Sequence, residues 1–290
     1  MIQALPLPAK INLYLDVLGR RPDGYHDICS AMVPVAPPLD ELSVIESHGP
    51  GITVSCGDTR VPQDQTNLVC RAATAFATAA RIAPRWHFEL TKGIPVAAGL
   101  GGGSADAAGT LRLLNEHYES VLAEEELHVL AAGLGADVAF FLKPRPLLAE
   151  GTGAELTAIP VGAELEIILV NPGFPVSAAW AYSHLERNSL PAAPPVSECL
   201  AALAQGSVAG VAGTCYNALE FAVRDKFPVV DMLIDFLCSN GCATAHVSGS
   251  GPTVFGVCEA GRQETIGETL EQRYGSAVWW CSTSVLPVLV

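Results

Sequence analysis

Four glycines stand close together in the segment Pro95-Val-Ala-Ala-Gly-Leu-Gly-Gly-Gly-Ser-Ala-Asp, which follows an expected strand and opens an expected helix. Glycine tolerates positive φ and leaves no side chain between the backbone and a ligand. Backbone N–H groups at the positive end of a helix dipole can therefore surround phosphate oxygens. The segment predicts a phosphate-binding loop, in which Ser104 could cap the helix, contact a phosphate oxygen or hold Mg²⁺.

Two familiar nucleotide-binding motifs do not fit this loop. No lysine follows the glycines, so the Gly-Lys-Ser/Thr of a P-loop is missing. The pattern G-x-G-x-x-G breaks at Ser104, and no parallel βαβ unit surrounds it. A flexible turn is the structural alternative, although four glycines in five residues would be an entropic liability for a mere connection.

Two charged residues lie next to apolar segments. Lys10 interrupts AKINLYL, where an ammonium group needs a partner or a wet cleft because unpaired burial is costly. Asp137 follows a glycine turn and opens an apolar segment, which suits a carboxylate aimed into a cleft. The two could be a catalytic pair, a structural ion pair or unrelated surface groups. Asn12 faces the same side of a strand as Lys10, so it could bond an accepting hydroxyl or be an ordinary edge-strand residue.

Apolar periodicity predicts the elements that must position these residues. The expected strands are residues 10–19, 42–45, 52–55, 86–91, 165–170, 243–247, 253–258 and 277–282. The expected helices are residues 67–82, 104–118, 124–134, 177–187, 217–223, 229–239 and 263–274. Strands separated by helices, with hairpin-like pairs, indicate an α+β fold in two layers rather than a doubly wound parallel sheet. A change of pattern after Glu150-Gly-Thr-Gly predicts domains at 1–153 and 154–290.

Charge and cysteine content narrow the class of protein. Sixteen basic and thirty acidic residues among 290 give a net charge of −14, which argues against nucleic acid and anionic membranes as partners. A few local cations and backbone amides would still suffice for a small phosphate ligand. The nine cysteines form no C-x-x-C pair, so neither zinc nor a disulfide framework is expected. With no signal-like start and no long apolar run, we expect a reduced, cytoplasmic protein.

The glycine loop PxxxGLGGGSADAA resembles the phosphate-binding motif of the GHMP kinase superfamily. The segment Val247-Ser-Gly-Ser-Gly-Pro-Thr also fits, as a second glycine loop that could brace the phosphate site. KINLYL, GRRPDGYHD, NLV, GADVAFF, EGTG and NPGFPVS follow in register and resemble the family of 4-diphosphocytidyl-2-C-methyl-D-erythritol kinases. The resemblance implies a two-domain GHMP kinase fold. An N-terminal ribosomal-protein-S5-like nucleotide-binding domain would precede a C-terminal ferredoxin-like α/β sandwich, with the active site between them.

This resemblance implies ATP-dependent phosphorylation of the 2-hydroxyl of 4-diphosphocytidyl-2-C-methyl-D-erythritol, in the non-mevalonate route to isopentenyl diphosphate. The expected ligands are ATP, Mg²⁺ carried with ATP rather than held in a protein cage, and a cytidine-diphosphate-linked sugar alcohol. The protein would be a monomer or a homodimer. Alternatives are another GHMP kinase, acting on homoserine, mevalonate or a sugar, and a nucleotide-binding regulator without phosphoryl transfer. Pro22-Asp-Gly-Tyr-His discriminates, since a kinase whose acceptor lacks a nucleobase does not need it.

The resemblance also assigns roles to individual residues. Asp137 would be the general base, and Lys10 the cation that favours the ionised carboxylate and stabilises the developing alkoxide. Asn12 would bond the accepting hydroxyl. Tyr25 and His26 would recognise cytosine by stacking and by hydrogen bonds to the base edge. Tyr182 would form the other face of a base sandwich, although its spacing from Ala178 and Ala179 also fits a plain core position.

The residues expected at ATP are the glycine loop and, near the adenine and ribose, Asn67 and Lys92. The loop set is Pro95, Val96, Ala97, Ala98, Gly99, Leu100, Gly101, Gly102, Gly103, Ser104 and Ala105. Ala178 departs from the family, in which many relatives carry threonine at that position. Neighbouring Ser177 could supply the missing hydroxyl contact to the diphosphate.

Overall fold

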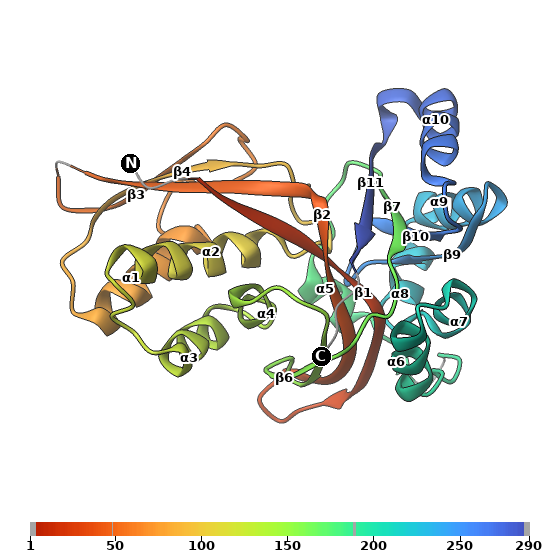
Figure 1. Cartoon of the computed structure of the whole chain (residues 1–290), viewed down its shortest axis with the longest axis horizontal. Helices are drawn as coiled ribbons and strands as arrows, with labels where there is room; N and C mark the ends of the chain where they lie inside the picture. The colour runs from red at the N-terminus through yellow and green to blue at the C-terminus, as the bar shows by residue number, and fades with distance from the viewer. Residues whose placement is uncertain (1–3, 48, 188–189, 287–290) are drawn as a thin grey trace. The chain divides into compact units, whose positions relative to one another are not determined.

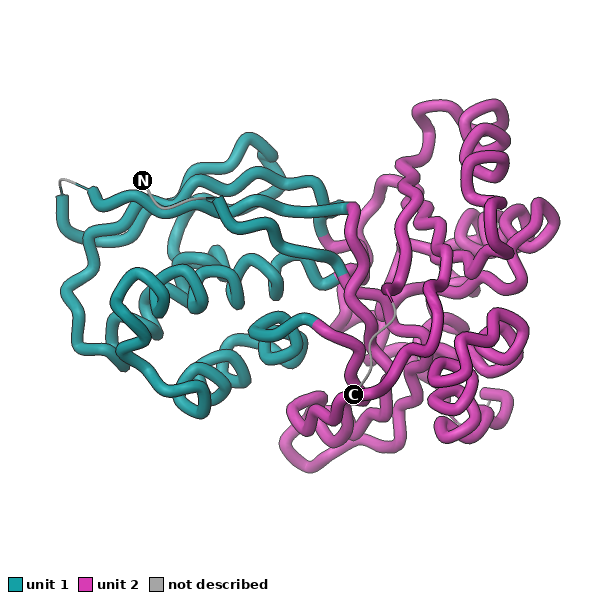
Figure 2. The backbone as a smooth tube through the Cα atoms, in the orientation of Figure 1, with its two compact units in different colours: residues 1–9, 38–96, 101–144 teal, residues 10–37, 97–100, 145–290 magenta. Residues whose placement is uncertain are grey.

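The computed structural model describes residues 4–47, 49–187 and 190–286. The chain forms two compact units (Figure 2). Unit 1 comprises residues 1–9, 38–96 and 101–144, and unit 2 comprises residues 10–37, 97–100 and 145–290. The chain therefore passes between the units several times, and the division into sequence domains 1–153 and 154–290 stays a prediction.

In its described residues, unit 1 combines a small sheet with four helices. Residues 41–46 of β2 pair antiparallel with β4, and β3 pairs parallel with β4. The helices pack on one another and lie along one side of these strands (Figure 1). The elements are β2 (His26–Glu46), β3 (Gly51–Cys56), β4 (Arg85–Thr91), α1 (Leu68–Ala80), α2 (Gly102–His117), α3 (Glu124–Leu134) and α4 (Val138–Leu142). The fully buried aromatic side chains of Phe76, Trp86 and Phe88 fill the core because apolar residues alternate along β4 and repeat along α1.

Unit 2 contains two sets of strands. In the first, β1 pairs parallel with β8, residues 28–32 of β2 pair antiparallel with β5, and β5 pairs antiparallel with β6. The second is an antiparallel sheet in the order β11-β7-β10-β9. The strands are β1 (Leu5–Arg20), β5 (Leu147–Gly151), β6 (Glu155–Ala158), β7 (Leu165–Asn171), β8 (Tyr216–Asn217), β9 (Cys242–Val247), β10 (Val254–Cys258) and β11 (Trp279–Val285).

Some of the helices of unit 2 pack on its second sheet. α9 packs against β9 and β10, and α10 packs against β7 and β11. The helices are α5 (Ala178–Ser183), α6 (Val196–Gln205), α7 (Val208–Thr214), α8 (Glu220–Lys226), α9 (Pro228–Ser239) and α10 (Gln263–Tyr274), with a 3₁₀ turn at Gly275–Ala277. The layered mixture of strands and helices confirms the predicted α+β class.

Several expected elements have different bounds. The strand expected at 42–45 is part of the 21-residue β2. The helix expected at 177–187 is limited to α5, because Ser177 caps it and the regular turns end at Ser183. The helix expected at 217–223 was wrong at its start, since Asn217 lies in β8 and α8 begins at Glu220. α6 and α7 were not expected at all.

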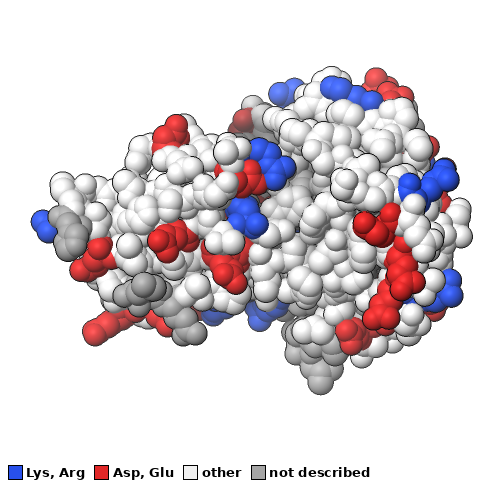
Figure 3. All heavy atoms as spheres, turned by 90° about the horizontal axis from the view of Figure 1, so that it is seen from above, with Lys and Arg blue, Asp and Glu red and all other residues white. Residues whose placement is uncertain are grey.

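The surface charge has no dominant basic region on the face drawn in Figure 3. Among the described residues visible there, Asp and Glu are spread widely, and Lys and Arg occur in small separate groups. The same described part of the chain has no helix with the length and apolar character needed to cross a bilayer.

Candidate active site

The glycine loop leads directly into helix α2. Gly101 is the residue before the helix and has a φ of +75°, a conformation that suits glycine. Because Gly101 has no side chain, no side-chain cap occupies the N–H groups of the first turn of α2. These groups and the helix dipole form the kind of site that binds phosphate oxygens. Of the three roles left open for Ser104, helix capping does not apply, since α2 begins two residues earlier at Gly102.

Within unit 2, a second glycine loop braces the first half of the phosphate loop. A Cβ on Gly99 would lie 2.0 Å from the carbonyl oxygen of Ser248 and 2.8 Å from the backbone nitrogen of Gly251, so only glycine fits there. The Ser248 hydroxyl donates a hydrogen bond of 3.0 Å to the Gly99 carbonyl. The backbone N–H of Thr253 donates to the Ala98 carbonyl at 3.3 Å. These contacts agree with the bracing role that the sequence predicts for residues 247–253.

Lys10 and Asn12 are buried beside these loops in unit 2. Each residue is 4% exposed, which excludes an ordinary exposed edge position for Asn12. The Lys10 ammonium donates to Asn12 Oδ1 at 2.6 Å, and Asn12 Nδ2 donates to Ser30 Oγ at 2.8 Å. A Cβ on Gly249 would lie 3.2 Å from Lys10 Nζ and 3.3 Å from Asn12 Oδ1. The cation, the amide and both glycine loops are therefore neighbours.

Asp137 lies in unit 1, immediately before α4. All five residues of α4 are buried, so this short helix is firmly anchored. The Asp137 side chain does not cap α4, and the residue is half-buried. The anchored helix thus fixes the backbone that carries the carboxylate.

The rings of His26 and Tyr182 stack in unit 2. Their centroids are 5.0 Å apart with an interplanar angle of 22°, a spacing that leaves no room for a third ring between them. Tyr182 is half-buried rather than a core residue, and Tyr25 is 65% exposed. Burial, and secondarily Arg20, lower the pKa of His26, so its imidazole is neutral near pH 7 with one donor and one acceptor nitrogen.

Behind the start of α2, unit 1 holds a cluster of three charged side chains: Asp40, Lys92 and Asp106. The Lys92 ammonium donates to Asp40 Oδ2 and, at 2.8 Å, to Asp106 Oδ2. Asp40 Oδ1 accepts the backbone N–H groups of Gly93 and Ile94, both at 2.9 Å. All three side chains are at least 94% buried. The cluster therefore links β2, the turn after β4 and the second turn of α2.

The charge balance of this cluster is uneven. Burial lowers the pKa of Lys92, but the carboxylates of Asp106 and Asp40 outweigh burial, so the net shift is upward. Burial raises the pKa of Asp106 to about 7 against the opposing effect of Lys92, and Asp40 adds to the rise. Asp106 Oδ1 is buried and has no hydrogen-bond partner among the described residues. One cation therefore does not fully compensate two buried carboxylates.

The position of Lys92 bears on its expected ATP contact. A Cβ on Gly102 would lie 3.2 Å from Lys92 Nζ, so the ammonium is close to the glycine loop while it is bonded to the two carboxylates. Asn67 has a clear local role, because its side chain accepts the N–H of Val69 at 2.8 Å and caps α1. The ATP contacts of both residues stay predictions.

Some neighbours of the site were missed from the sequence. Ser30, Asp40 and Asp106 contact predicted residues, but their partners are 14 to 52 positions away in the chain and no local pattern reveals such contacts. Asp106 lies inside the glycine motif quoted above. An acidic residue in a segment of otherwise small and apolar residues was the sequence feature that could have indicated its role. Ser177 also has a local role, since its hydroxyl accepts the N–H of Trp180 at 3.4 Å.

Comparison with known proteins defines the class first. Residues 67–144 match the family GHMP kinases N terminal domain, and residues 197–276 match GHMP kinases C terminal. The fold agrees with a homoserine kinase from Cytophaga hutchinsonii, with a TM-score of 0.78, 19% identity, and coverage of 99% of this chain and 96% of that chain. These matches define a GHMP kinase, the class of ATP-dependent small-molecule kinases.

The curated relatives narrow the class. A 4-diphosphocytidyl-2-C-methyl-D-erythritol kinase of Geobacter sulfurreducens is 42% identical over 255 residues, 88% of this chain and 89% of the relative. One of Pelobacter propionicus is 40% identical over 270 residues, 90% and 94% of the two chains. A crystal structure of 4-(cytidine 5'-diphospho)-2C-methyl-D-erythritol kinase has a TM-score of 0.80 and 31% identity, covering 97% of this chain and 99% of that chain. The chain belongs to the family of 4-diphosphocytidyl-2-C-methyl-D-erythritol kinases.

Proposed function

We propose that this kinase transfers the γ-phosphoryl group of ATP to the 2-hydroxyl of 4-diphosphocytidyl-2-C-methyl-D-erythritol. The product is the 2-phosphate, and the reaction belongs to the non-mevalonate route to isopentenyl diphosphate. Family membership supports the phosphoryl transfer and the acceptor. The observation that carries the choice of acceptor is the stacked His26–Tyr182 ring pair in the unit that also holds Lys10 and Asn12.

The ring pair suits a cytosine better than an acceptor without a base. Stacked aromatic faces and a neutral imidazole offer a surface for a flat base and hydrogen bonds to its edge. Because no third ring fits between His26 and Tyr182, cytosine would stack on the outer face of the pair or displace one ring. Exposed Tyr25 is adjacent in sequence and would cover the other face of the base. Homoserine and mevalonate offer nothing for such a surface to recognise.

The acceptor hydroxyl needs a base and a nearby positive charge. Phosphoryl transfer depends on in-line positioning and on neutralising charge at the transferred group. In this proposal Asp137 accepts the hydroxyl proton, and the Lys10 ammonium stabilises the developing alkoxide. Asn12 would orient the hydroxyl, since its side chain is already fixed by hydrogen bonds to Lys10 and Ser30.

The phosphates of ATP fit the glycine loop. The uncapped N–H groups of the first turn of α2 would bind their oxygens, and residues 95–105 would approach closely because the loop carries few side chains. Lys92 would act here as a buried charge beside Gly102, and Asn67 would contribute near the adenine and ribose.

Mg²⁺ would neutralise the phosphate oxygens of ATP when bound. The described residues contain no group of three or more His, Cys, Asp or Glu side chains placed to hold a metal ion, so ATP itself would supply most of the ligands. The Ser104 hydroxyl suits a Mg²⁺ or phosphate contact, because it lies in the first turn of α2 and is not the helix cap.

The same proposal covers the setting of the reaction. All nine cysteines are free thiols, six of them buried, which suits a reducing cytoplasm. The ligands would be ATP and the cytidine-diphosphate-linked sugar alcohol, with no nucleic acid or membrane partner. The protein would act as a monomer or a homodimer.

Replacing His26 tests the choice of acceptor. His26→Ala should raise the KM for the cytidyl substrate by about tenfold, because stacking a base on an aromatic ring stabilises binding by about 1–3 kcal/mol. The KM for ATP should change little, since the ring pair is assigned to the acceptor alone. Steady-state kinetics with each substrate varied in turn provide the measurement.

His117→Ala is the matched control. The His117 ring also contacts a tyrosine ring, that of Tyr118, with the two ring centroids 4.7 Å apart. His117 lies in unit 1, outside the proposed site. Both KM values should stay at the wild-type level in this variant. Equal changes in the two KM values of His26→Ala would refute the assignment of cytosine to this ring pair.

A further inference from the structure

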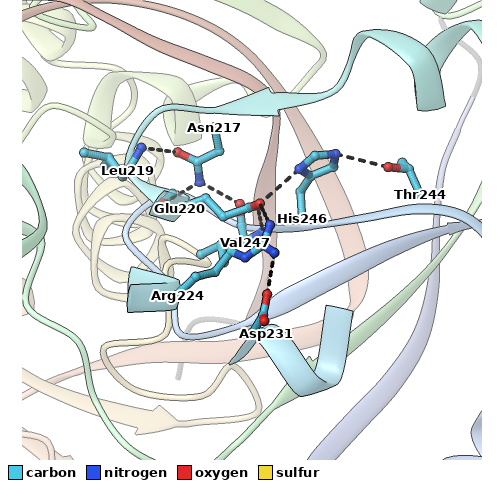
Figure 4. A network of polar contacts seen from close by, with 9 residues as sticks. Asn217, Leu219, Glu220, Arg224, Asp231, Thr244, His246 and Val247 are labelled. Carbon is cyan, nitrogen blue, oxygen red and sulfur yellow. Dashed lines mark hydrogen bonds and ion pairs between the residues drawn. The ribbon is translucent and has the colours of Figure 1, made fainter. Parts of the chain in front are cut away.

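The Asn217 side chain makes hydrogen bonds through both its nitrogen and its oxygen inside unit 2, where the residue is 2% exposed. Its Nδ2 atom donates a hydrogen bond to the carbonyl of Val247 at 2.7 Å (Figure 4). The same atom donates a second hydrogen bond to the carbonyl of Gly249 at 2.8 Å. Its Oδ1 atom accepts the N–H of Leu219 at 2.9 Å. The amide thus holds both ends of the turn that begins the second glycine loop, and it also fixes the start of α8.

Glu220 completes this network from the first position of α8. Its Oε2 atom accepts the backbone N–H of Val247 at 2.7 Å and lies 3.2 Å from His246 Nδ1. Its Oε1 atom pairs with Arg224 at 3.2 Å, and Arg224 pairs in turn with Asp231 (Figure 4). Glu220 is 3% exposed, so Arg224 supplies the positive charge that a buried carboxylate needs.

The loop held by this network contacts the proposed catalytic groups. Ser248 bonds the Gly99 carbonyl, and the Cβ position of Gly249 faces Lys10 Nζ and Asn12 Oδ1. Gly249 has a φ of +55°, so the backbone at this contact is in a conformation that few other residues adopt readily. A shift of the 247–249 backbone would therefore move groups that lie directly against the phosphate loop and against Lys10.

We infer that Asn217 and Glu220 are positioning residues for phosphoryl transfer. They act through the backbone of residues 247–249, which sets the spacing between Gly99 and the Lys10–Asn12 pair. Neither residue needs to touch a substrate for this role. The inference rests on the proposed function, because it assumes that Lys10 and the glycine loop serve the transfer step.

Two substitutions at Asn217 separate this role from the local turn in which Asn217 Oδ1 accepts the Leu219 N–H before α8. Asn217→Asp keeps an oxygen that accepts the Leu219 N–H, but it removes both donors to the loop carbonyls. Asn217→Ala removes both functions. We expect both variants to lose kcat by about 10- to 100-fold, the scale seen when a reacting group is misplaced by about 1 Å.

The split between kinetic constants distinguishes positioning from general damage. The KM for the cytidyl substrate should change by less than about twofold, since His26 and Tyr182 lie in other segments. Leu237→Ala is the control, because Leu237 is a fully buried residue of α9 in the same unit and outside the network. It should lower the thermal midpoint while kcat, measured below that midpoint, stays at the wild-type level.

Three results would overturn the inference. Wild-type kcat in Asn217→Asp with a loss only in Asn217→Ala would show that the side chain serves only the turn before α8, through its bond to the Leu219 N–H. An equal loss of kcat in Leu237→Ala would show that turnover follows stability. If Asn217→Asp does not fold, Ser248→Ala decides: loss of one hydrogen bond to Gly99 should lower kcat by about fivefold, and wild-type kcat would refute the role.

The wild-type reaction separates the inference from the proposed function. Absence of ATP-dependent phosphorylation of the cytidyl acceptor by the wild type would contradict the proposed function and the inference that rests on it. Normal wild-type turnover together with normal turnover in Asn217→Asp would contradict the inference alone.

Discussion

In unit 1, one cation between two carboxylates holds the start of α2, whereas in unit 2 a neutral amide and one carboxylate hold the second glycine loop, residues 247–253. Lys92 joins Asp40 and Asp106 in the first case, and their side chains are almost fully buried. Asn217 and Glu220 hold the second loop through three hydrogen bonds to its backbone. The charged cluster and the amide network each contact a glycine-rich segment.

The difference predicts different consequences of damage. Removing one member of a buried ion cluster leaves an uncompensated charge, so the main loss is folding stability. Removing a neutral donor leaves a carbonyl without a hydrogen bond and allows the backbone segment to shift. The main consequence is then a displaced loop rather than a lower free energy of unfolding. We therefore expect the ion cluster to secure the helix that would bind phosphate, and the amide network to position the proposed catalytic groups.

Asp137→Asn should give the largest loss of kcat. Because Asp137 belongs to neither the charged cluster nor the amide network, this loss shows how large the effect of removing a proposed chemical group is, for comparison with those two supports. Removing a general base typically lowers turnover by about 10²–10⁴-fold. We expect a loss of kcat in this range, with ATP affinity retained because the glycine loop is intact. Kinetics together with a nucleotide-binding titration provide the measurement. Unchanged turnover would remove Asp137 from the role of base.

Lys92→Met should produce the next largest effect, and mainly on stability. It leaves Asp40 and Asp106 buried without their cation, which typically costs about 3–5 kcal/mol. Denaturant unfolding of the variant and the wild type measures this loss. The free energy of unfolding should fall by that amount, with weaker ATP binding as a secondary effect.

Lys143→Met is the control for this change. Lys143 pairs with Glu124 in the same unit, but its side chain is 63% exposed, so the loss should be at most about 1 kcal/mol. Similar losses in the two variants would contradict a special role for the buried cluster.

Asp106→Asn should have the smallest effect, visible as a change in pH dependence. The pKa of Asp106 in the folded protein is about 7, above its ordinary value of 3.8. The folded state therefore holds a proton that the unfolded state has released, and stability falls as pH rises toward 7. Between pH 5 and 8 the wild type should lose about 2 kcal/mol more than Asp106→Asn.

Asp58→Asn is the matched control for the pH experiment. The Arg60 side chain lowers the pKa of Asp58 to about 2, so this carboxylate is ionised in both folded and unfolded states above pH 5. The substitution should leave the slope between pH 5 and 8 unchanged. A wild-type slope in Asp106→Asn would show that Asp106 does not carry the extra proton.

Much of the fold could be predicted because apolar periodicity is strong where an element has one buried face. α3 and α10 have the predicted bounds, and β7 extends the prediction by one residue. β2 was largely missed because Pro34, Pro37 and Pro38 argue against a continuous strand. The helix α6 follows a proline-rich loop and was missed because its apolar periodicity is weak. Only Cys199, Ala202 and Leu203 are buried in it, and two of these three side chains are small.

The residues of the candidate site also include some that the sequence could predict and some that it could not. Motif residues such as Lys10, Gly99 and His26 could be identified because their local sequence is distinctive, and the structure brings Lys10 and Gly99 to the same loops. Asn217 could not be identified, because its partners Val247 and Gly249 are 30 and 32 residues away. A hydrogen bond to a distant carbonyl leaves no trace in the spacing of side chains.

The most direct test of the central claim is ATP consumption by the wild-type protein with acceptors that carry or lack the cytidyl group. The account predicts rapid consumption with 4-diphosphocytidyl-2-C-methyl-D-erythritol and formation of its 2-phosphate. It predicts background rates with homoserine, mevalonate and the sugar alcohol that lacks the cytidyl diphosphate. Equal rates with any of these acceptors would contradict cytidyl recognition and with it the proposed function.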